Sequence, residues 1–309
     1  MATREAAAPQ PLRLRATRRR WGEDVVKVVL ALCAFVSVAT TVGIVVALFA
    51  PAFEFFGEIS ITDFLTGRSW APLFEPPAFG VLPLIAGTLL VTACACLVCI
   101  PFGLGSAIYL SEYARPRTRK FLKPALEVLA GIPTVVYGYF ALTFVAPLLQ
   151  DIGLPVSVFS ALAAGLVMGV MLLPTVASIS EDSMAAVPRD LRDGAYALGS
   201  TRVQVATKIV VPAAISGIIA SFVLAISRAV GETMIVLIAA GGQPNWTWNP
   251  LEAVQTMTAF IAATGQGDVP TGSIEYKTIF AVGATLFVMT FVMNLISIRL
   301  VRRFREVYE

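Results

Sequence analysis

The stretch DGAYALGSTRVQVATKIVVP, residues 193–212, is polar and helical in pattern although long apolar runs flank it on both sides. Gly199 stands where a left-handed helix terminus is expected. Thr201 and Gln204 have the spacing of a capping box, which begins a second helix. Pro212 ends that helix before the next apolar run. The stretch therefore predicts a helix–turn–helix on the surface of a membrane-embedded chain.

The first of these two helices starts just before the quoted stretch, within the polar loop 181–212. Pro188 favours a helix beginning at its own position, because its missing N–H and fixed φ suit the first turn. Leu191, Ala195 and Leu198 then recur at i, i+4 and i+7, which is an amphipathic stripe. We expect this short helix to present one apolar face.

Apolar runs dominate the rest of the 309 residues: 57% are hydrophobic and 14% are charged. A soluble domain has about 25% charged residues, and a membrane-spanning helix needs about 20 apolar residues. Six segments meet this requirement, at about 25–50, 82–110, 121–149, 156–180, 213–241 and 278–301. The pattern predicts an all-α membrane protein with six transmembrane helices. A basic tail, 1–24, precedes a transmembrane domain, 25–309.

Basic residues indicate the orientation of these spans, because cytoplasmic loops are enriched in Lys and Arg. With the N-terminus in the cytoplasm, the expected external segments contain only Arg68 and Lys277, and Arg228 lies inside a span. All other basic residues then fall on the cytoplasmic side. Both termini and the loop 181–212 are therefore expected in the cytoplasm.

Arg228 and Glu232 are charged residues near the middle of the fifth predicted span. Charges at this depth are costly and usually face a cavity or a partner. Their spacing would place both on one face of a continuous helix, together with Gly217, Ser221 and Ala225. We expect Arg228 and Glu232 to pair when the pathway is empty, and Arg228 to bind an oxyanion during passage. The alternative is a fixed ion pair that orients helices, and the small residues can line a pathway or pack closely.

Several kinds of chemistry are disfavoured. The chain contains no histidine, and Cys94, Cys96 and Cys99 lie in an apolar run, where they are interpreted as small apolar residues. No metal site and no cofactor are expected. A phosphate-binding G-x-x-x-x-G-K-[ST] loop is missing from the sequence. ATP hydrolysis would therefore belong to another polypeptide, and this chain is not expected to be an enzyme. Nothing indicates a nucleic-acid partner.

The loop resembles the "EAA" loop of ABC importer permeases, E-A-A-x3-G-x9-I-x-L-P. The matching positions are Asp193, Gly194, Ala195, Gly199, Ile209, Val211 and Pro212. Asp193, Gly194 and Val211 depart from the family pattern, and Gly194 weakens the helix by about 1 kcal/mol relative to Ala. In that family the helix pair docks in a groove of the ATPase subunit. The resemblance implies a type I ABC importer (MetI-like) transmembrane domain.

Three further stretches resemble the PstC-type phosphate permeases: SRAVGETM at 227–234, FGVLPLIAGTL at 79–89 and AGIPTVVYG at 130–138. This resemblance implies a permease subunit that translocates inorganic phosphate across the cytoplasmic membrane of a prokaryote. It also implies a PstA-like second permease, two PstB-like ATPase subunits that bind ATP and Mg, and an external PstS-like phosphate-binding protein.

Other functions stay open at this point. An arginine also binds sulfate, molybdate or phosphonate, so the choice of phosphate rests on the family resemblance. A secondary anion transporter would often show inverted repeats, and none is evident. A membrane-embedded enzyme would need convergent catalytic groups, which the spans lack.

Overall fold

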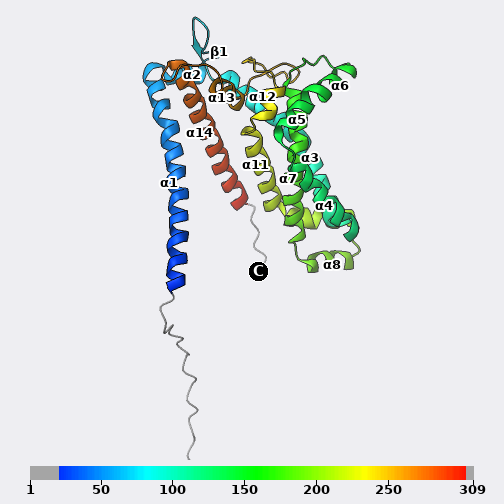
Figure 1. Ribbon diagram of the computed structural model, residues 1–309. Coiled ribbons are helices and arrows are strands. Elements are labelled where there is room, and N and C mark those ends of the chain that lie inside the picture. Colours follow the sequence, from blue (N-terminus) through cyan, green and yellow to red (C-terminus); the bar gives the residue numbers. More distant parts are fainter. Residues whose placement is uncertain (1–20, 304–309) are drawn as a thin grey trace, which may run out of the picture. The chain divides into compact units, whose positions relative to one another are not determined.

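The computed structural model describes residues 21–303 (Figure 1). The basic segment 1–20 of the predicted tail and residues 304–309, including Arg305, lie outside the described residues. The chain divides into two parts, 1–47 and 48–309. The first part contributes most of α1 (Trp21–Glu58), an apolar helix 38 residues long.

The described residues of the second part form helices, one two-stranded hairpin and connecting loops. Before the hairpin comes α2 (Ile61–Thr66), and the strands β1 (Trp70–Ala71) and β2 (Ala78–Phe79) pair antiparallel, with Trp70 opposite Phe79. The later helices are α3 (Leu82–Ile108), π-helical η1 (Tyr109–Tyr113), α4 (Pro116–Ala130), α5 (Thr134–Phe140), π-helical η2 (Ala141–Val145), α6 (Ala146–Asp151), α7 (Ala161–Ala185), α8 (Arg189–Ala197), α9 (Arg202–Val205), π-helical η3 (Ala206–Val210), α10 (Val211–Ala213), α11 (Ile215–Val230), α12 (Met234–Ala239), α13 (Met257–Gly265) and α14 (Ile274–Arg303).

Within the described residues, four helices are long and apolar enough to cross a membrane: α1, α3 with η1, α7 and α14. Two bent pairs raise the number to six if each pair counts as one span. The first pair joins α4 to α5, η2 and α6 with an angle of 86°, and the second joins the helix ending at Ala213 to α11 with an angle of 72°. The membrane-protein fold expected from the sequence is therefore present, with two spans that are not straight.

Close packing of α3 on α7 forms the centre of the bundle. A Cβ atom built on Gly165 would lie 2.4 Å from the Cβ of Cys94, and one on Gly169 would lie 2.6 Å from the Cβ of Val98. Small residues let membrane helices approach this closely. Met168 and Leu172 of α7 are fully buried in the same cluster. Cys94 is thus a small buried packing residue.

The third predicted span, 121–149, is not one straight helix. It breaks at Gly131, Ile132 and Pro133, between α4 and α5. Pro133 disfavours helical backbone at the residue before it, which explains the position of the break. Pro133 also has no backbone N–H to donate to a helical hydrogen bond, so a separate helix begins at Thr134.

The fifth predicted span, 213–241, is also discontinuous. α11 ends at Val230 and α12 starts at Met234, with Gly231 as the C-terminal cap. The helices that follow the two breaks, α5 and α12, pack tightly on each other. A Cβ atom on Gly138 would lie 3.1 Å from the Cδ1 of Ile238. The folded chain thus brings two interrupted spans side by side.

Candidate functional site

The break between α11 and α12 is organised by Glu232. Its Oε1 atom accepts hydrogen bonds from the backbone N–H of Met234 at 3.1 Å and of Ile235 at 3.4 Å. A carboxylate at a helix N-terminus satisfies free N–H groups and interacts favourably with the helix dipole. The backbone carbonyl of Glu232 also accepts a hydrogen bond from the Thr258 hydroxyl at 2.6 Å. Both ends of this buried residue are therefore held in place.

The expected pairing of Arg228 with Glu232 is wrong for this structure. Among residues 21–303, no ion pair or hydrogen bond of Arg228 is found, and Arg228 is exposed while Glu232 is buried. The i, i+4 argument fails because α11 ends at Val230, between the two residues. The carboxylate is occupied by the N–H groups of α12, so it does not neutralise the guanidinium.

Arg228 lies in the last turn of α11, beside the break between α11 and α12. Its side chain is exposed and has no ion pair or hydrogen bond among residues 21–303. At the other break, between α4 and α5, the Tyr137 hydroxyl donates to the Leu129 carbonyl at 2.8 Å. An uncompensated guanidinium therefore lies where the fifth span is interrupted. This arrangement leaves its five N–H donors free for an anion.

The small residues on α11 pack against α7 and do not line a pathway. Ser221 and Ala225 are buried, and the Ser221 and Ser180 hydroxyl oxygens lie 2.8 Å apart. A Cβ on Gly217 would lie 2.0 Å from the Oγ of Ser183. The sequence left two roles open for this stripe, lining a pathway or packing closely against another helix, and in the structure it packs against α7.

A threonine network, which sequence reasoning missed, attaches α13 to the helix break. Thr256 caps α13 by accepting from the Ala259 N–H at 3.1 Å, and its hydroxyl oxygen lies 3.1 Å from that of Thr258. The N–H of Met257 donates to the Thr88 hydroxyl of α3 at 3.0 Å. Nothing in the apolar surroundings of Thr88 distinguishes it in the sequence, since its partner is 169 positions away.

The polar loop forms the two predicted helices. α8 begins at Arg189, one residue later than expected, because Pro188 adopts extended backbone as the N-cap. Gly199 has φ +81°, and the Ser200 N–H donates to the Ala195 carbonyl across the turn. The capping box of Thr201 and Gln204 is present, with the Thr201 N–H donating to the Gln204 Oε1 at 2.9 Å.

The predicted coupling residues divide into anchored and exposed positions. Ala195 is buried in a cluster with Met184 and Val205, and Ile209 packs against that cluster. The remaining positions, Asp193, Gly194, Gly199 and Pro212, are exposed. The loop therefore carries one anchored side and one free side.

Apolar side chains gather on the free side of the loop. Leu198 is 89% exposed, and Leu191, Tyr196 and Val203 are also exposed. Exposed apolar patches of this kind mark interaction surfaces. Only Ala195 of the predicted stripe faces the body of the chain, so Leu191 and Leu198 are available to a partner.

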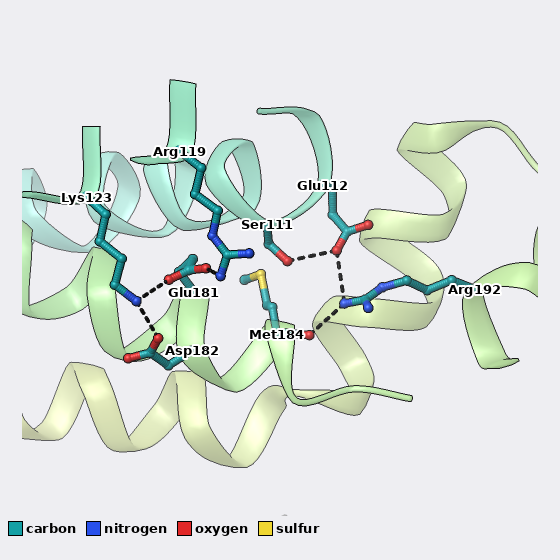
Figure 2. Close-up of polar contacts among 8 residues, drawn as sticks. All are labelled: Ser111, Glu112, Arg119, Lys123, Glu181, Asp182, Met184 and Arg192. Atoms are coloured by element: carbon teal, nitrogen blue, oxygen red, sulfur yellow. Dashed lines mark hydrogen bonds and ion pairs between the residues drawn. The ribbon is translucent and has the colours of Figure 1, made fainter. Parts of the chain in front are cut away.

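Charged side chains connect the ends of several helices near α8 (Figure 2). Glu181 of α7, fully buried, pairs with Arg119 and, at 2.8 Å, with Lys123 of α4. Lys123 also contacts Asp182 at 2.6 Å. Its partners are 58 and 59 positions away, beyond the reach of local pattern reasoning.

A second charged contact holds α8 itself. Arg192 lies 3.2 Å from the Oε1 of Glu112 in η1. The same guanidinium donates to the carbonyls of Met184 at 2.7 Å and Val187 at 3.2 Å, at the end of α7. Ser111 donates to the Glu112 carboxylate at 2.8 Å. Sequence reasoning gave Glu112 and Arg192 no such role.

Residues 99–306 match the family of binding-protein-dependent transport system inner membrane components. The chain belongs to this family. The permease is 36% identical to the probable ABC transporter permease YqgH of Bacillus subtilis over 87% of this chain and 88% of that protein. It is 32% identical to the phosphate transport system permease PstC of Mesorhizobium japonicum, over 82% of each, and 30% identical to the probable PstC of Methanocaldococcus jannaschii, over 83% and 85%.

Solved structures agree on the fold. The permease superposes on a chain of a bacterial alginate ABC transporter with TM-score 0.63 and 16% identity, over 92% of this chain and 98% of that one. A chain of the MetNI methionine ABC transporter gives TM-score 0.53 and 17% identity, over 74% and 95%. The chain is a PstC-type, multi-pass permease of the cytoplasmic membrane with the MetI-like fold.

Proposed function

We propose that this permease forms one half of the membrane pathway of an ATP-driven importer of inorganic phosphate. Curated relatives from several organisms are phosphate transport system permeases of the PstC type. The structural observation that carries the proposal is the free, exposed guanidinium of Arg228 at the end of α11, where the fifth span is interrupted.

Arg228 is suited to a phosphate oxyanion because its planar fork donates two parallel hydrogen bonds and keeps its charge. Glu232 lies four positions away, but its carboxylate is bound to the N–H groups of α12. The positive charge therefore stays available to a passing anion. An anion such as phosphate that binds Arg228 lowers the cost of placing both charges within the membrane.

The loop 181–212 transmits the ATPase cycle in this proposal. Its exposed apolar side, with Leu191 and Leu198, is the surface on which an ATPase subunit docks. ATP closes an ATPase dimer, the α8 helices of the two permeases move together, and the pathway opens outward. ATP shifts the equilibrium only because it binds the two states with different affinity.

The complex then consists of this chain, a PstA-like second permease, two PstB-like ATPase subunits and an external PstS-like phosphate-binding protein. ATP and Mg bind to the ATPase subunits, and this chain holds no cofactor and hydrolyses nothing. Its two termini and the loop 181–212 face the cytoplasm, in agreement with the distribution of basic residues.

The test is uptake of radiolabelled phosphate at low external phosphate, in cells that lack this chain and are complemented with the wild-type gene. The expected result is ATP-dependent uptake that excess unlabelled phosphate abolishes and excess sulfate or molybdate leaves intact. If complementation restores sulfate or molybdate uptake and not phosphate uptake, the assignment of phosphate is wrong although the permease assignment stands.

A further inference from the structure

The last turn of α7 lies between α8 and α4 and is bound to both by charged side chains (Figure 2). Glu181 and Met184 are three positions apart on α7. Glu181 binds α4 through its carboxylate, and Met184 binds Arg192 of α8 through its carbonyl. The last turn of α7 therefore joins two polar contacts, one to α8 and one to α4.

The attachment of α8 to the rest of the chain is small apart from Arg192. Ala195 is the only residue of α8 that is fully buried. The Arg192 side chain is 17% exposed and binds Glu112, Met184 and Val187, which belong to η1, to α7 and to the segment after α7. The single methyl group of Ala195 contacts its neighbours without directional bonds. The Arg192 guanidinium binds in three directions and therefore fixes the position of α8 against them.

The attachment of α4 has the same character. No residue of α4 is fully buried, while Glu181, its partner on α7, is. Arg119 and Lys123 both bind that carboxylate, and Lys123 also binds Asp182. Charge-assisted hydrogen bonds with a buried partner are strong and directional. A displacement of α7 at Glu181 must therefore carry α4 with it.

The far end of α4 leads directly to the broken spans. α4 ends at Ala130, and the chain continues through Gly131 and Pro133 into α5, which packs on α12 beside the Glu232 cap. Movement of α4 about this break would shift α5 against α12, which follows the interruption beside Arg228. The break gives α4 freedom to turn that an unbroken span would lack.

We propose that Arg192 and Glu181 are positioning residues that transmit movement of α8 to α4 and hence to the broken spans. This inference rests on the proposed function, in which α8 receives the ATPase subunit. Glu112 completes the arrangement by holding Arg192 against η1, so that α3, α7 and α8 move as one body at this end.

The test uses the whole importer, purified through a tag on this chain and reconstituted in vesicles with its external binding protein. ATP hydrolysis and phosphate uptake are measured in the same vesicles, and the result is the number of phosphate ions transported per ATP. We expect Arg192→Gln and Glu181→Gln to lower this ratio about fivefold or more, while hydrolysis continues. Arg192→Lys, which keeps the positive charge, should lower the ratio less than Arg192→Gln does.

Arg117→Gln is the matched control, because Arg117 is an exposed residue of α4 that has no ion-pair partner among residues 21–303. It should leave the ratio unchanged. If Glu181→Gln prevents assembly, Lys123→Gln tests the same contact, since the Lys123 side chain is 30% exposed.

Two results would overturn the inference. One is a wild-type ratio of phosphate to ATP in both single variants, Arg192→Gln and Glu181→Gln (or Lys123→Gln in its place). The other is a parallel loss of hydrolysis and uptake at constant ratio, which indicates a purely structural role. A wild-type complex that hydrolyses ATP and transports no phosphate would instead contradict the proposed function.

Discussion

Glu232, which precedes the N-cap Thr233, binds the first N–H groups of the helix that begins at Met234, with its carboxylate oxygen 3.1 Å from the Met234 nitrogen. One consequence is that the Glu232 carboxylate, which was expected to neutralise Arg228, binds backbone N–H groups of α12 instead. A second is that the break between α11 and α12 is stabilised by a specific side chain, so it is a built feature of the permease.

Glu232→Ala removes the acceptor for the N–H groups of Met234 and Ile235. We expect the free energy of unfolding to fall by about 1 kcal/mol, which is typical when a side-chain acceptor at a helix N-terminus is lost. Glu232→Gln keeps an acceptor oxygen and should lose less. Thermal unfolding of the purified permease complex in detergent measures both variants. Equal midpoints for Glu232→Ala and the wild type would show that the cap has no energetic role.

Arg228→Gln should abolish the charge that receives phosphate while leaving the fold intact, because Arg228 binds no other described residue. Losing a charge-assisted hydrogen bond costs roughly 1.5–3 kcal/mol, which corresponds to at least about tenfold in uptake. Arg228→Lys should retain part of the activity. The measurement is initial uptake rate against phosphate concentration at matched amounts of protein in the membrane. Wild-type kinetics in Arg228→Gln would exclude the pathway role.

Gly199→Ala and Gly194→Ala form a matched pair in the loop 181–212. Gly199 has φ +81°, where an added Cβ costs about 1–2 kcal/mol although space is open around it. Gly194 is helical, and Ala there should stabilise α8 by about 1 kcal/mol.

Limited proteolysis of the loop in detergent distinguishes these two variants. Cleavage should become faster in Gly199→Ala and slower in Gly194→Ala. The same direction of change in both variants would contradict the assignment of the turn to Gly199.

Gly165→Ala tests the close approach of α3 and α7. The new Cβ would lie 2.4 Å from the Cβ of Cys94, so the two helices must separate. Overpacking of this kind costs about 1–3 kcal/mol. Gly105→Ala on α3 is the control, because its Cβ meets nothing within 4 Å. We expect less intact protein in the membrane for Gly165→Ala only; similar amounts for both variants would rule out a tight contact at Gly165.

Local patterns in the sequence predicted a large part of the structure. The capping box of Thr201 and Gln204, the turn at Gly199 and the apolar helices are each decided by residues within a few positions of one another. The cause of one break was also visible, since Pro133 lies inside the third apolar run. A proline inside a membrane span indicates a kink or a break, but hydropathy averages over the interruption and does not distinguish the two.

The charged contacts could not be predicted in the same way. Glu181 was the first residue of a polar loop in the sequence, and in the structure it is a fully buried partner of Arg119 and Lys123. Arg192 looked like an ordinary cytoplasmic arginine. Which cation meets which carboxylate depends on how helices far apart in sequence come together.

The sequence by itself determined that this chain is a helical membrane permease, because apolar length, basic-residue placement and the 193–212 pattern are local properties. Only the tertiary structure decided that Glu232 caps α12 and leaves Arg228 free, and that Arg192 and Glu181 join α8 to α4. The physical reason is that a charge inside a membrane protein takes whichever partner the packing of neighbouring helices brings within reach, and i, i+4 spacing selects that partner only where the helix continues.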